Sequence, residues 1–258
     1  MTDLLPYYKE FAPKSESAHL IGAFWSFSMP YSNGVIKHRV LPDGCMDVIF
    51  QYQRALGGGI YNPQLTIYGS TDSFKLFEIK PSTEFVGVRF HPGMAGLFLK
   101  LNPIELFQQQ AKAQDCSEEF GKIFDRLCES NSVEKALSTL QTSILELQKV
   151  NCEDSVSLPI REALKLITIS NGTMPVSHIA LAIGISERTL RRGVTKAVGL
   201  SPKVLARILR FQNTMLRLRA SETADLCRFA LDCGYADQAH MGREFQRLSG
   251  LTPTAFIS

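Results

Sequence analysis

Residues 179–186, with the sequence IALAIGIS, recur fifty positions later as residues 229–236, with the sequence FALDCGYA. Each copy places an apolar residue and then an alanine five and four residues before a glycine. Alanine lets a second helix cross closely, and glycine adopts the left-handed backbone of a tight turn. The apolar residue after the glycine fills the corner between the two helices. Each copy therefore predicts one helix-turn-helix unit.

The repeat continues beyond the turn at an offset of fifty-one residues. The paired positions are Leu190 and Met241, Arg192 and Arg243, Val194 and Phe245, and the runs 199–202 (GLSP) and 250–253 (GLTP). Agreement at so many structural positions indicates two copies of one unit. Ser186 and Asp237 are the expected N-caps of the two second helices, because their side chains can accept hydrogen bonds from free amide groups. Between the units, residues 202–219 read as a long amphipathic helix that would hold them at a fixed separation.

Four segments of the C-terminal part carry a family resemblance: ISERTLRR (185–192), GLSPKVLARILR (199–210), CGYADQAHMGREF (233–245) and GLTPTAF (250–256). Over residues 158–258 the chain resembles the AraC/XylS family of bacterial transcription regulators. The resemblance implies a long helix between two helix-turn-helix units, whose second helices enter successive major-groove segments about one helical turn apart. The segments LPDGCMDVIF (41–50) and FVGVRFHPGM (85–94) resemble the sensor domain of one branch of this family.

The same resemblance implies which side chains read DNA bases. In the first unit these are Arg188, Arg191 and Arg192, and arginine can bond guanine O6 and N7 with two hydrogen bonds. The alternative for these arginines is a solvated basic face on a surface helix. In the second unit the base-contact positions are Gln238, Ala239 and Arg243, with His240 beside them. Because Ala239 offers only an apolar contact, the second unit is expected to discriminate less than the first.

Contacts to phosphate are expected from Lys196, Lys203 and Arg247. Five further arginines are either phosphate neighbours or surface charges: Arg207, Arg210, Arg217, Arg219 and Arg228. The first unit departs from the family pattern at two places. Gly193 stands where a large apolar residue is usual, and Val194 stands where a bulky aromatic residue is usual. A glycine within a helix costs about 1 kcal/mol relative to alanine, so the first unit is expected to be looser.

Charge divides the chain into two parts of opposite sign. Residues 1–155 carry 14 Lys and Arg against 18 Asp and Glu, whereas residues 156–258 carry 14 against 7. A compact basic part indicates that only the C-terminal part meets a polyanion, here double-stranded DNA. The polar run 151–157 is the candidate linker. We therefore expect a sensing or dimerisation domain at 1–155, the front domain, and a DNA-binding domain at 156–258, the back domain.

The first ninety residues alternate between apolar and polar side chains, as strands do. Alternating apolar positions are found at Ile21, Ala23, Trp25, Phe27 and Met29, and after a Pro-Asp-Gly turn at Met46, Val48, Phe50 and Tyr52. Residues 65–68, 74–79 and 85–90 supply further strands, so the front domain should be a small sandwich or barrel. From Pro92 onward the period becomes helical. The predicted fold class is α+β: a β-rich front domain with trailing helices, followed by an all-α domain of two helix-turn-helix units.

One of the trailing helices carries an apolar stripe with the 3.5-residue spacing of a coiled-coil seam. Its members are Val133, Leu137, Leu140, Ile144 and Leu147. The stripe has two interpretations. It packs on the front domain's own core, or it is the seam of a homodimer.

Composition and motifs argue against an enzyme. The six cysteines form no C-x-x-C pair, and His19, His38 and His91 are isolated, so no metal site or other cofactor is expected. No phosphate-binding glycine loop or nucleophile elbow is present. No apolar run is long enough to cross a membrane, and the N-terminus does not read as a signal peptide, so we expect a cytoplasmic protein.

Three interpretations of the front domain stay open. It senses an unidentified small-molecule effector, it serves only for dimerisation or for contact with a partner protein such as RNA polymerase, or, as a remote alternative, it is an enzyme domain fused to a DNA reader. No pattern among its aromatic side chains, or among Arg39, Asp47 and Arg89, specifies a ligand.

Overall fold

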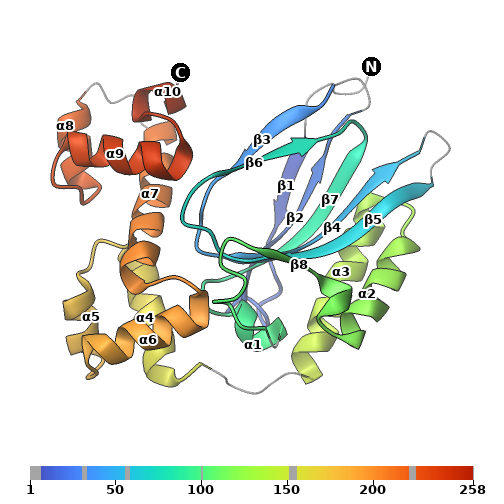
Figure 1. The fold of residues 1–258 in the computed structure, drawn as a ribbon, viewed down its shortest axis with the longest axis horizontal. Helices are drawn as coiled ribbons and strands as arrows, with labels where there is room; N and C mark the ends of the chain where they lie inside the picture. Colours follow the sequence, from blue (N-terminus) through green and yellow to red (C-terminus); the bar gives the residue numbers. More distant parts are fainter. Residues whose placement is uncertain are drawn as a thin grey trace.

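The computed structural model describes residues 7–30, 34–55, 59–99, 101–150, 156–220 and 225–257. A β-rich N-terminal part and a helical C-terminal part lie side by side (Figure 1). The predicted α+β architecture is confirmed. Of the predicted linker 151–157, residues 151–155 lie outside the described residues, and so does the predicted domain boundary at residue 155.

The front domain is built on a six-stranded antiparallel sheet. Its strand order is β1 (Tyr7–Phe11), β2 (Ile21–Ser28), β7 (Thr83–Phe90), β4 (Met46–Arg54), β5 (Ile60–Tyr68) and β8 (Gln110–Lys112). A second sheet pairs β3 (Ile36–Val40) with β6 (Lys75–Ile79). Alternation in β4 is as predicted, because Met46, Val48, Phe50 and Tyr52 are all buried on one face. In β2 the register shifts between Ile21 and Ala23. The side chains of Ile21 and Trp25 therefore belong to different apolar clusters, on opposite faces of the large sheet.

Helices cover one face of the large sheet. After the short helix α1 (Ala95–Leu99) and the 3-10 turn η1 (Ala113–Asp115), α2 (Glu118–Cys128) and α3 (Val133–Val150) pack together against the strands. The apolar stripe of α3 faces this core: Leu137, Leu140, Ile144 and Leu147 are buried, and Val133 packs against the same cluster. The dimer-seam interpretation of the stripe is therefore wrong, because the sheet occupies the surface that a partner helix would need.

The other face of the large sheet packs against β3 and β6. Trp25, Phe27, Met29 and Ile79 form the buried cluster there, with Ile49 and other apolar side chains only partly covered.

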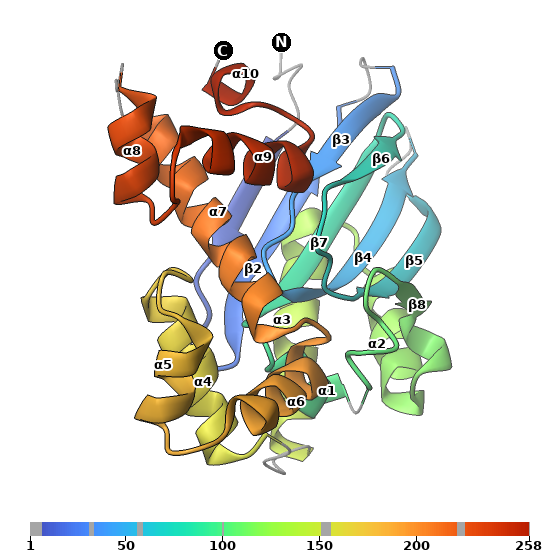
Figure 2. The same cartoon turned by 60° about the vertical axis from the view of Figure 1, so that its left-hand side comes forward.

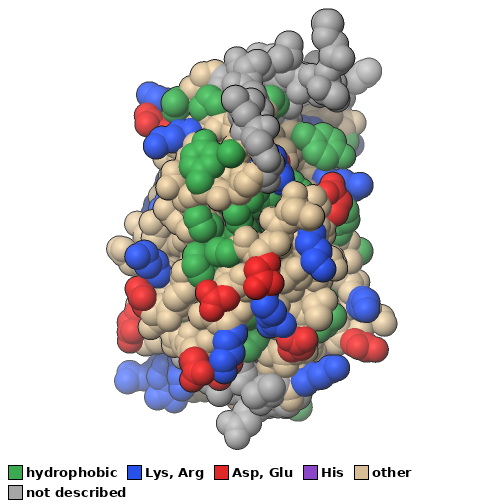
Figure 3. Space-filling view, turned by 90° about the vertical axis from the view of Figure 1, so that its right-hand side faces the viewer, with side chains coloured by type: hydrophobic (Ala, Val, Ile, Leu, Met, Phe, Trp, Pro, Cys, Tyr) green, Lys and Arg blue, Asp and Glu red, His purple; other side chains and the backbone are tan. Residues whose placement is uncertain are grey.

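On the face of the molecule seen in Figure 3, hydrophobic side chains gather in the upper centre, and acidic and basic side chains are interspersed below them. Such a mixture gives no continuous basic surface for a polyanion.

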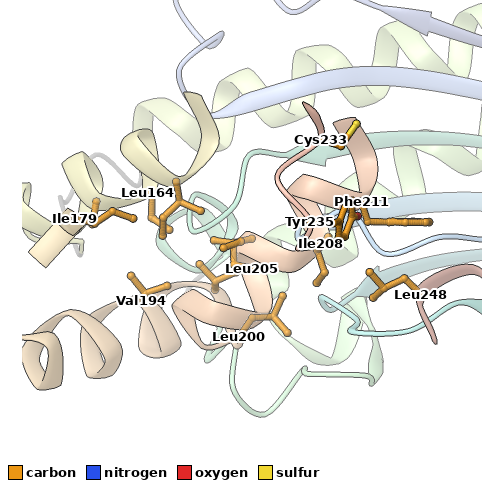
Figure 4. Close-up of a cluster of buried hydrophobic side chains, with 14 of the residues drawn as sticks. Leu164, Ile179, Val194, Leu200, Leu205, Ile208, Phe211, Cys233, Tyr235 and Leu248 are labelled. Carbon is orange, nitrogen blue, oxygen red and sulfur yellow. The ribbon is translucent and has the colours of Figure 1, made fainter. Parts of the chain in front are cut away.

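The back domain contains seven helices among the described residues. They are α4 (Leu158–Ile169), α5 (Val176–Ala182), α6 (Glu187–Val198), α7 (Pro202–Ala220), α8 (Leu226–Asp232), α9 (Gln238–Ser249) and α10 (Pro253–Ile257). One apolar cluster runs through the domain, and α7 contributes Leu205, Ile208 and Phe211 to it (Figure 4). Helices α6 and α9 lie near opposite ends of α7 (Figures 1 and 2). None of the described helices is long and apolar enough to span a membrane.

Candidate nucleic-acid interface

The two predicted turns have the same local geometry. Gly184 and Gly234 both adopt the left-handed conformation, with φ of 71° and 81°. The amide of the next residue, Ile185 in one unit and Tyr235 in the other, donates to the carbonyl of the buried alanine at 3.1 and 3.0 Å. The repeat identified in the sequence is therefore a repeat of structure, with α5–α6 as the first helix-turn-helix and α8–α9 as the second.

The second helix of each unit, α6 or α9, is capped as the sequence predicted. The Ser186 hydroxyl accepts from the Thr189 amide at 3.1 Å, and the Asp237 carboxylate accepts from the His240 amide at 2.6 Å. Both helices end at a left-handed glycine, Gly199 or Gly250, whose amide donates to a carbonyl four residues earlier at 2.8 Å. We call α6 and α9 the recognition helices from here on because they carry the predicted base-contact residues.

The predicted base-contact residues all lie on the exposed faces of the recognition helices. On α6, Leu190, Val194 and Ala197 face the core, whereas the four basic side chains Arg188, Arg191, Arg192 and Lys196 point away from it. On α9, Gln238, Ala239 and Arg243 lie on the side away from the core. The His240 side chain is only partly exposed, because its ring packs edge-on against Tyr235 and its Nδ1 lies 3.3 Å from the Ala236 amide. Each unit thus presents one polar face, and the first face is the more basic.

Gly193 has a packing role that the sequence did not reveal. A Cβ at this position would lie 2.6 Å from Cγ1 of Ile160 and closer still to its Cδ1, so α4 approaches α6 directly over the glycine. Val194 beside it is fully buried. Ile160 thus occupies the space that a larger residue on α6 would have filled, and the lower helix propensity of glycine remains the basis for expecting a looser first unit.

Several arginines of the back domain are structural. Arg207 on α7 pairs with Glu244 on α9, with Nε and Oε2 2.6 Å apart, and both side chains are about four-fifths buried. Three others bond or stack within the domain: Arg210 donates to the Gly172 carbonyl at 2.9 Å, Arg217 donates to the Asp232 carbonyl at 2.8 Å, and Arg219 stacks over Phe256. These contacts within the protein argue against a role in phosphate binding for Arg207, Arg210, Arg217 and Arg219. Among the described residues, Lys196, Lys203 and Arg228 make no such contact, and the exposed Arg247 lies 3.9 Å from the Asp72 carboxylate of the front domain; all four stay candidates.

The Arg207–Glu244 pair was missed by sequence reasoning. Glu244 is the one acidic residue of α9, and it sits thirty-seven positions from its partner on another helix. A solitary acid in a basic recognition helix was the available signal. The pair joins the long helix to the second recognition helix and restrains its orientation.

The front domain holds a partly buried polar cluster around Arg89. Its Nε lies 3.1 Å from Oδ2 of Asp43 and 3.4 Å from Oδ1 of Asp47, and Asp47 accepts a hydrogen bond from the Trp25 indole at 2.9 Å. Burial raises the pKa of Asp47 to about 6, although the Arg89 charge opposes that rise. Among the described residues, no group of three or more His, Cys, Asp or Glu side chains could hold a metal ion.

Comparison with known proteins assigns the two parts separately. Residues 179–258 match a family described as a helix-turn-helix domain, and residues 9–112 match a domain of unknown function (DUF6597). No curated protein sequence matches the chain.

Solved structures of ToxT from Vibrio cholerae are similar over most of this chain. One is 11% identical, covers 90% of this chain and 95% of that chain, and superposes with a TM-score of 0.43. A second, bound to (E)-4-(8-methylnaphthalen-1-yl)but-3-enoic acid, is 12% identical with 90% and 96% covered and a TM-score of 0.43. A third, bound to unsaturated fatty acid, is 10% identical with 98% and 94% covered and a TM-score of 0.41.

Proposed function

Because residues 179–258 form a helix-turn-helix domain of the AraC type, we propose that the chain is a sequence-specific, ligand-responsive transcription regulator. Its recognition helices α6 and α9 enter successive major-groove segments of double-stranded DNA. One observation carries the proposal. Two units repeat the same turn, N-cap and C-cap at constant offset, and each leaves one polar helix face exposed.

The first unit is proposed to read bases with Arg188, Arg191 and Arg192. Their side chains are exposed on one helix, while the buried residues of that helix anchor it to α4 and α7. Exposed guanidinium groups on a major-groove helix are suited to guanine, since each can donate two hydrogen bonds to O6 and N7. The second unit is proposed to read bases with Gln238, Ala239 and Arg243. It carries fewer donors and therefore contributes less to sequence discrimination.

Phosphate contacts are proposed for Lys196, Lys203 and Arg247. All three lie at the surface, and lysine acts on phosphate as a point charge whose effect does not depend on base sequence. These contacts would position the domain on the duplex and make its affinity depend on salt.

For the front domain we propose binding of a small-molecule effector. The face of the large sheet that packs against β3 and β6 carries Trp25 and Phe27, with Ile49 and Phe85 only partly covered and the Arg89 cluster on the same face. Apolar side chains with a few polar groups are typical of small-molecule sites. The second candidate is contact with a partner protein such as RNA polymerase. A homodimer through the α3 stripe is not proposed, and a chain with two recognition helices needs no second copy to read two segments.

Selection of DNA tests the proposal. The full chain is incubated with a pool of random duplexes, bound DNA is recovered and sequenced, and the cycle is repeated. We expect enrichment of two sequence boxes about 10 base pairs apart from centre to centre, with guanine in the box read by α6. Arg188→Ala should relax the guanine preference in that box alone. A pool that acquires no common sequence would refute the proposal.

A further inference from the structure

The front domain binds the C-terminal ends of both recognition helices. The Ser70 hydroxyl donates to the carbonyl of Val198, the last residue of α6, at 2.8 Å. Nη1 of Arg39 donates to the carbonyl of Ser249, the last residue of α9, also at 2.8 Å. Val198 and Ser249 are fifty-one residues apart, which is the offset of the repeat. The front domain, which does not itself contain the repeat, therefore contacts the equivalent carbonyl oxygen in both copies of the repeat.

The capping glycines are contacted in the same paired way. A Cβ on Gly199 would lie 2.5 Å from the carbonyl oxygen of Pro103, and a Cβ on Gly250 would lie 2.6 Å from Cζ of Phe74. Both glycines are left-handed and equivalent in the repeat. The front-domain backbone and the Phe74 ring thus approach the two helix ends as closely as a residue without a side chain permits.

The side chains that make these contacts lie close together in the front domain and are linked by further contacts. Ser70 and Phe74 lie on the segment 69–74 between β5 and β6, and Arg39 on β3 places its guanidinium 5.1 Å from the Phe74 ring centre. The segment is tied to its neighbour by hydrogen bonds: the Gln108 amide donates to the Ser70 carbonyl at 2.9 Å, and the Gly69 amide donates to the Gln109 carbonyl at 3.0 Å. A shift of this segment would therefore move both contacts together.

Physical chemistry explains why these sites are suitable for holding a helix. The last carbonyls of a helix have no partner within the helix, and the C-terminus carries partial negative charge. A donor there satisfies a free acceptor, and the Arg39 charge adds a favourable interaction with the end of α9. The hydrogen bond from Ser70 is buried, so water does not compete for it. The contacts lie at the helix ends and leave the faces that carry Arg188 and Arg243 uncovered.

The front domain also contacts the helix that joins the two units. Nε2 of Gln212 on α7 donates to the Pro42 carbonyl at 2.6 Å. A Cβ on Gly44 would lie 2.5 Å from Cδ1 of Leu205, also on α7. The front domain thus contacts both recognition helices and the helix α7 that connects them.

From these contacts we propose that Ser70, Arg39 and Phe74 are positioning residues for DNA recognition, and that the front domain sets the separation between the two DNA segments that the chain accepts. The inference rests on the proposed function. A connector helix fixes the relative orientation of the two units only if each unit is rigidly packed against it. Because the front domain holds the far end of each recognition helix, it restricts the rotation of one unit relative to the other.

The test compares the spacing of DNA boxes selected by full-length variants from random duplex pools. The first variant combines Arg39→Ala with Phe74→Ala, which frees the end of α9, and the second is Ser70→Ala, which frees the end of α6. The matched control is Lys37→Ala, an exposed charge on the same strand as Arg39. Circular dichroism and thermal unfolding establish that each variant is folded.

We expect wild type and the control to select two boxes at one separation. Both interface variants should select the same boxes at separations that differ by one or two base pairs. A hydrogen bond from a neutral hydroxyl typically alters an equilibrium by up to about tenfold, and one from a charged group by at least about tenfold. Preference for the selected spacing over a site lengthened by one base pair should therefore fall by up to about tenfold in Ser70→Ala and by at least about tenfold in the Arg39 and Phe74 variant. Affinity for a duplex with a single box should not change, because the recognition faces are intact.

Other results overturn the inference. If the variants keep the wild-type separation, the front domain does not set it. If affinity for single boxes falls as much as affinity for paired boxes, Ser70, Arg39 and Phe74 support only the fold. If the control broadens the spacing as well, the effect is not due to the helix ends. A wild-type chain that enriches no DNA removes the proposed function, and this inference with it.

Discussion

Replacing Gly193 by alanine should fail to stabilise the protein, although glycine lies in the middle of helix α6. Alanine in place of glycine within a helix ordinarily stabilises by about 1 kcal/mol. At Gly193 the new methyl group would meet Ile160, whose Cγ1 lies 2.6 Å from the position that the methyl carbon would take. The added atom must therefore displace α4 or force Ile160 from its rotamer.

The expected magnitude follows from the two opposing effects. Overpacking a filled core costs about 1–3 kcal/mol, which offsets or exceeds the helix gain. Gly193→Ala should change the free energy of unfolding by between about 0 and −2 kcal/mol. Gly242 in α9 is the matched control, because a Cβ there would have no atom within 4 Å. Gly242→Ala should stabilise by about 1 kcal/mol.

Urea unfolding of the two variants, followed by circular dichroism, measures the difference. Ile160→Ala in the Gly193→Ala background supplies the second control, since it removes the atoms that the new methyl group meets. The two changes should be coupled favourably, so that together they cost less than the sum of the single changes. Equal stabilisation by both glycine replacements, or strict additivity with Ile160→Ala, would refute the packing argument.

Three further predictions test the proposed DNA contacts and two ion pairs. In fluorescence anisotropy, Arg192→Ala should weaken binding to the selected site by about 1–3 kcal/mol and binding to random DNA little, whereas Arg247→Ala should weaken binding to both DNAs alike. Equal losses on the two DNAs for Arg192→Ala would show that Arg192 contacts phosphate. Arg207→Ala leaves the largely buried Glu244 carboxylate without its partner and should cost about 1–3 kcal/mol in urea unfolding, part of which Glu244→Gln should recover. Burial raises the pKa of Asp47 from 3.8 to about 6, so the folded state binds the proton more tightly than the unfolded state. The free energy of unfolding should therefore decrease as pH rises through this interval and level off above it, and Asp47→Asn should remove the decrease; an unchanged pH profile would contradict the shift.

The helix-turn-helix units could be predicted from the sequence because their determinants are local. Each unit needs a turn glycine and an N-cap, and their hydrogen bonds reach residues no more than five positions away along the chain. The glycines are Gly184 and Gly234, and the N-caps are Ser186 and Asp237. Strand β4 was equally accessible, since its alternating side chains report which face is buried. Local determinants appear in sequence as fixed spacings, and here the spacing occurs twice.

The stripe on α3 shows why periodicity alone does not identify a partner. Residues 133–147 repeat at the coiled-coil interval, and that interval requires only that one side of the helix is apolar. A sheet face and a second helix satisfy the requirement equally. The large sheet supplies the covering surface in this chain, because its helix-facing side chains from β2 and β7 lie against α3.

Contacts between the two domains had no sequence signal at all, and they make the two copies of the repeat unequal. Ser70 and Val198 are separated by 128 positions, and Arg39 and Ser249 by 210, so no periodicity connects them. The two helix ends are chemically equivalent, but a neutral, buried hydroxyl holds α6 whereas a partly exposed guanidinium holds α9. A change in the front domain that displaces Arg39 but not the segment 69–74 would therefore act on the second unit and leave the Ser70 contact to the first unit in place. Under the proposed function the second unit also presents fewer donors to base edges, so its position on DNA would depend more on the contacts that hold it than on the bases that it reads.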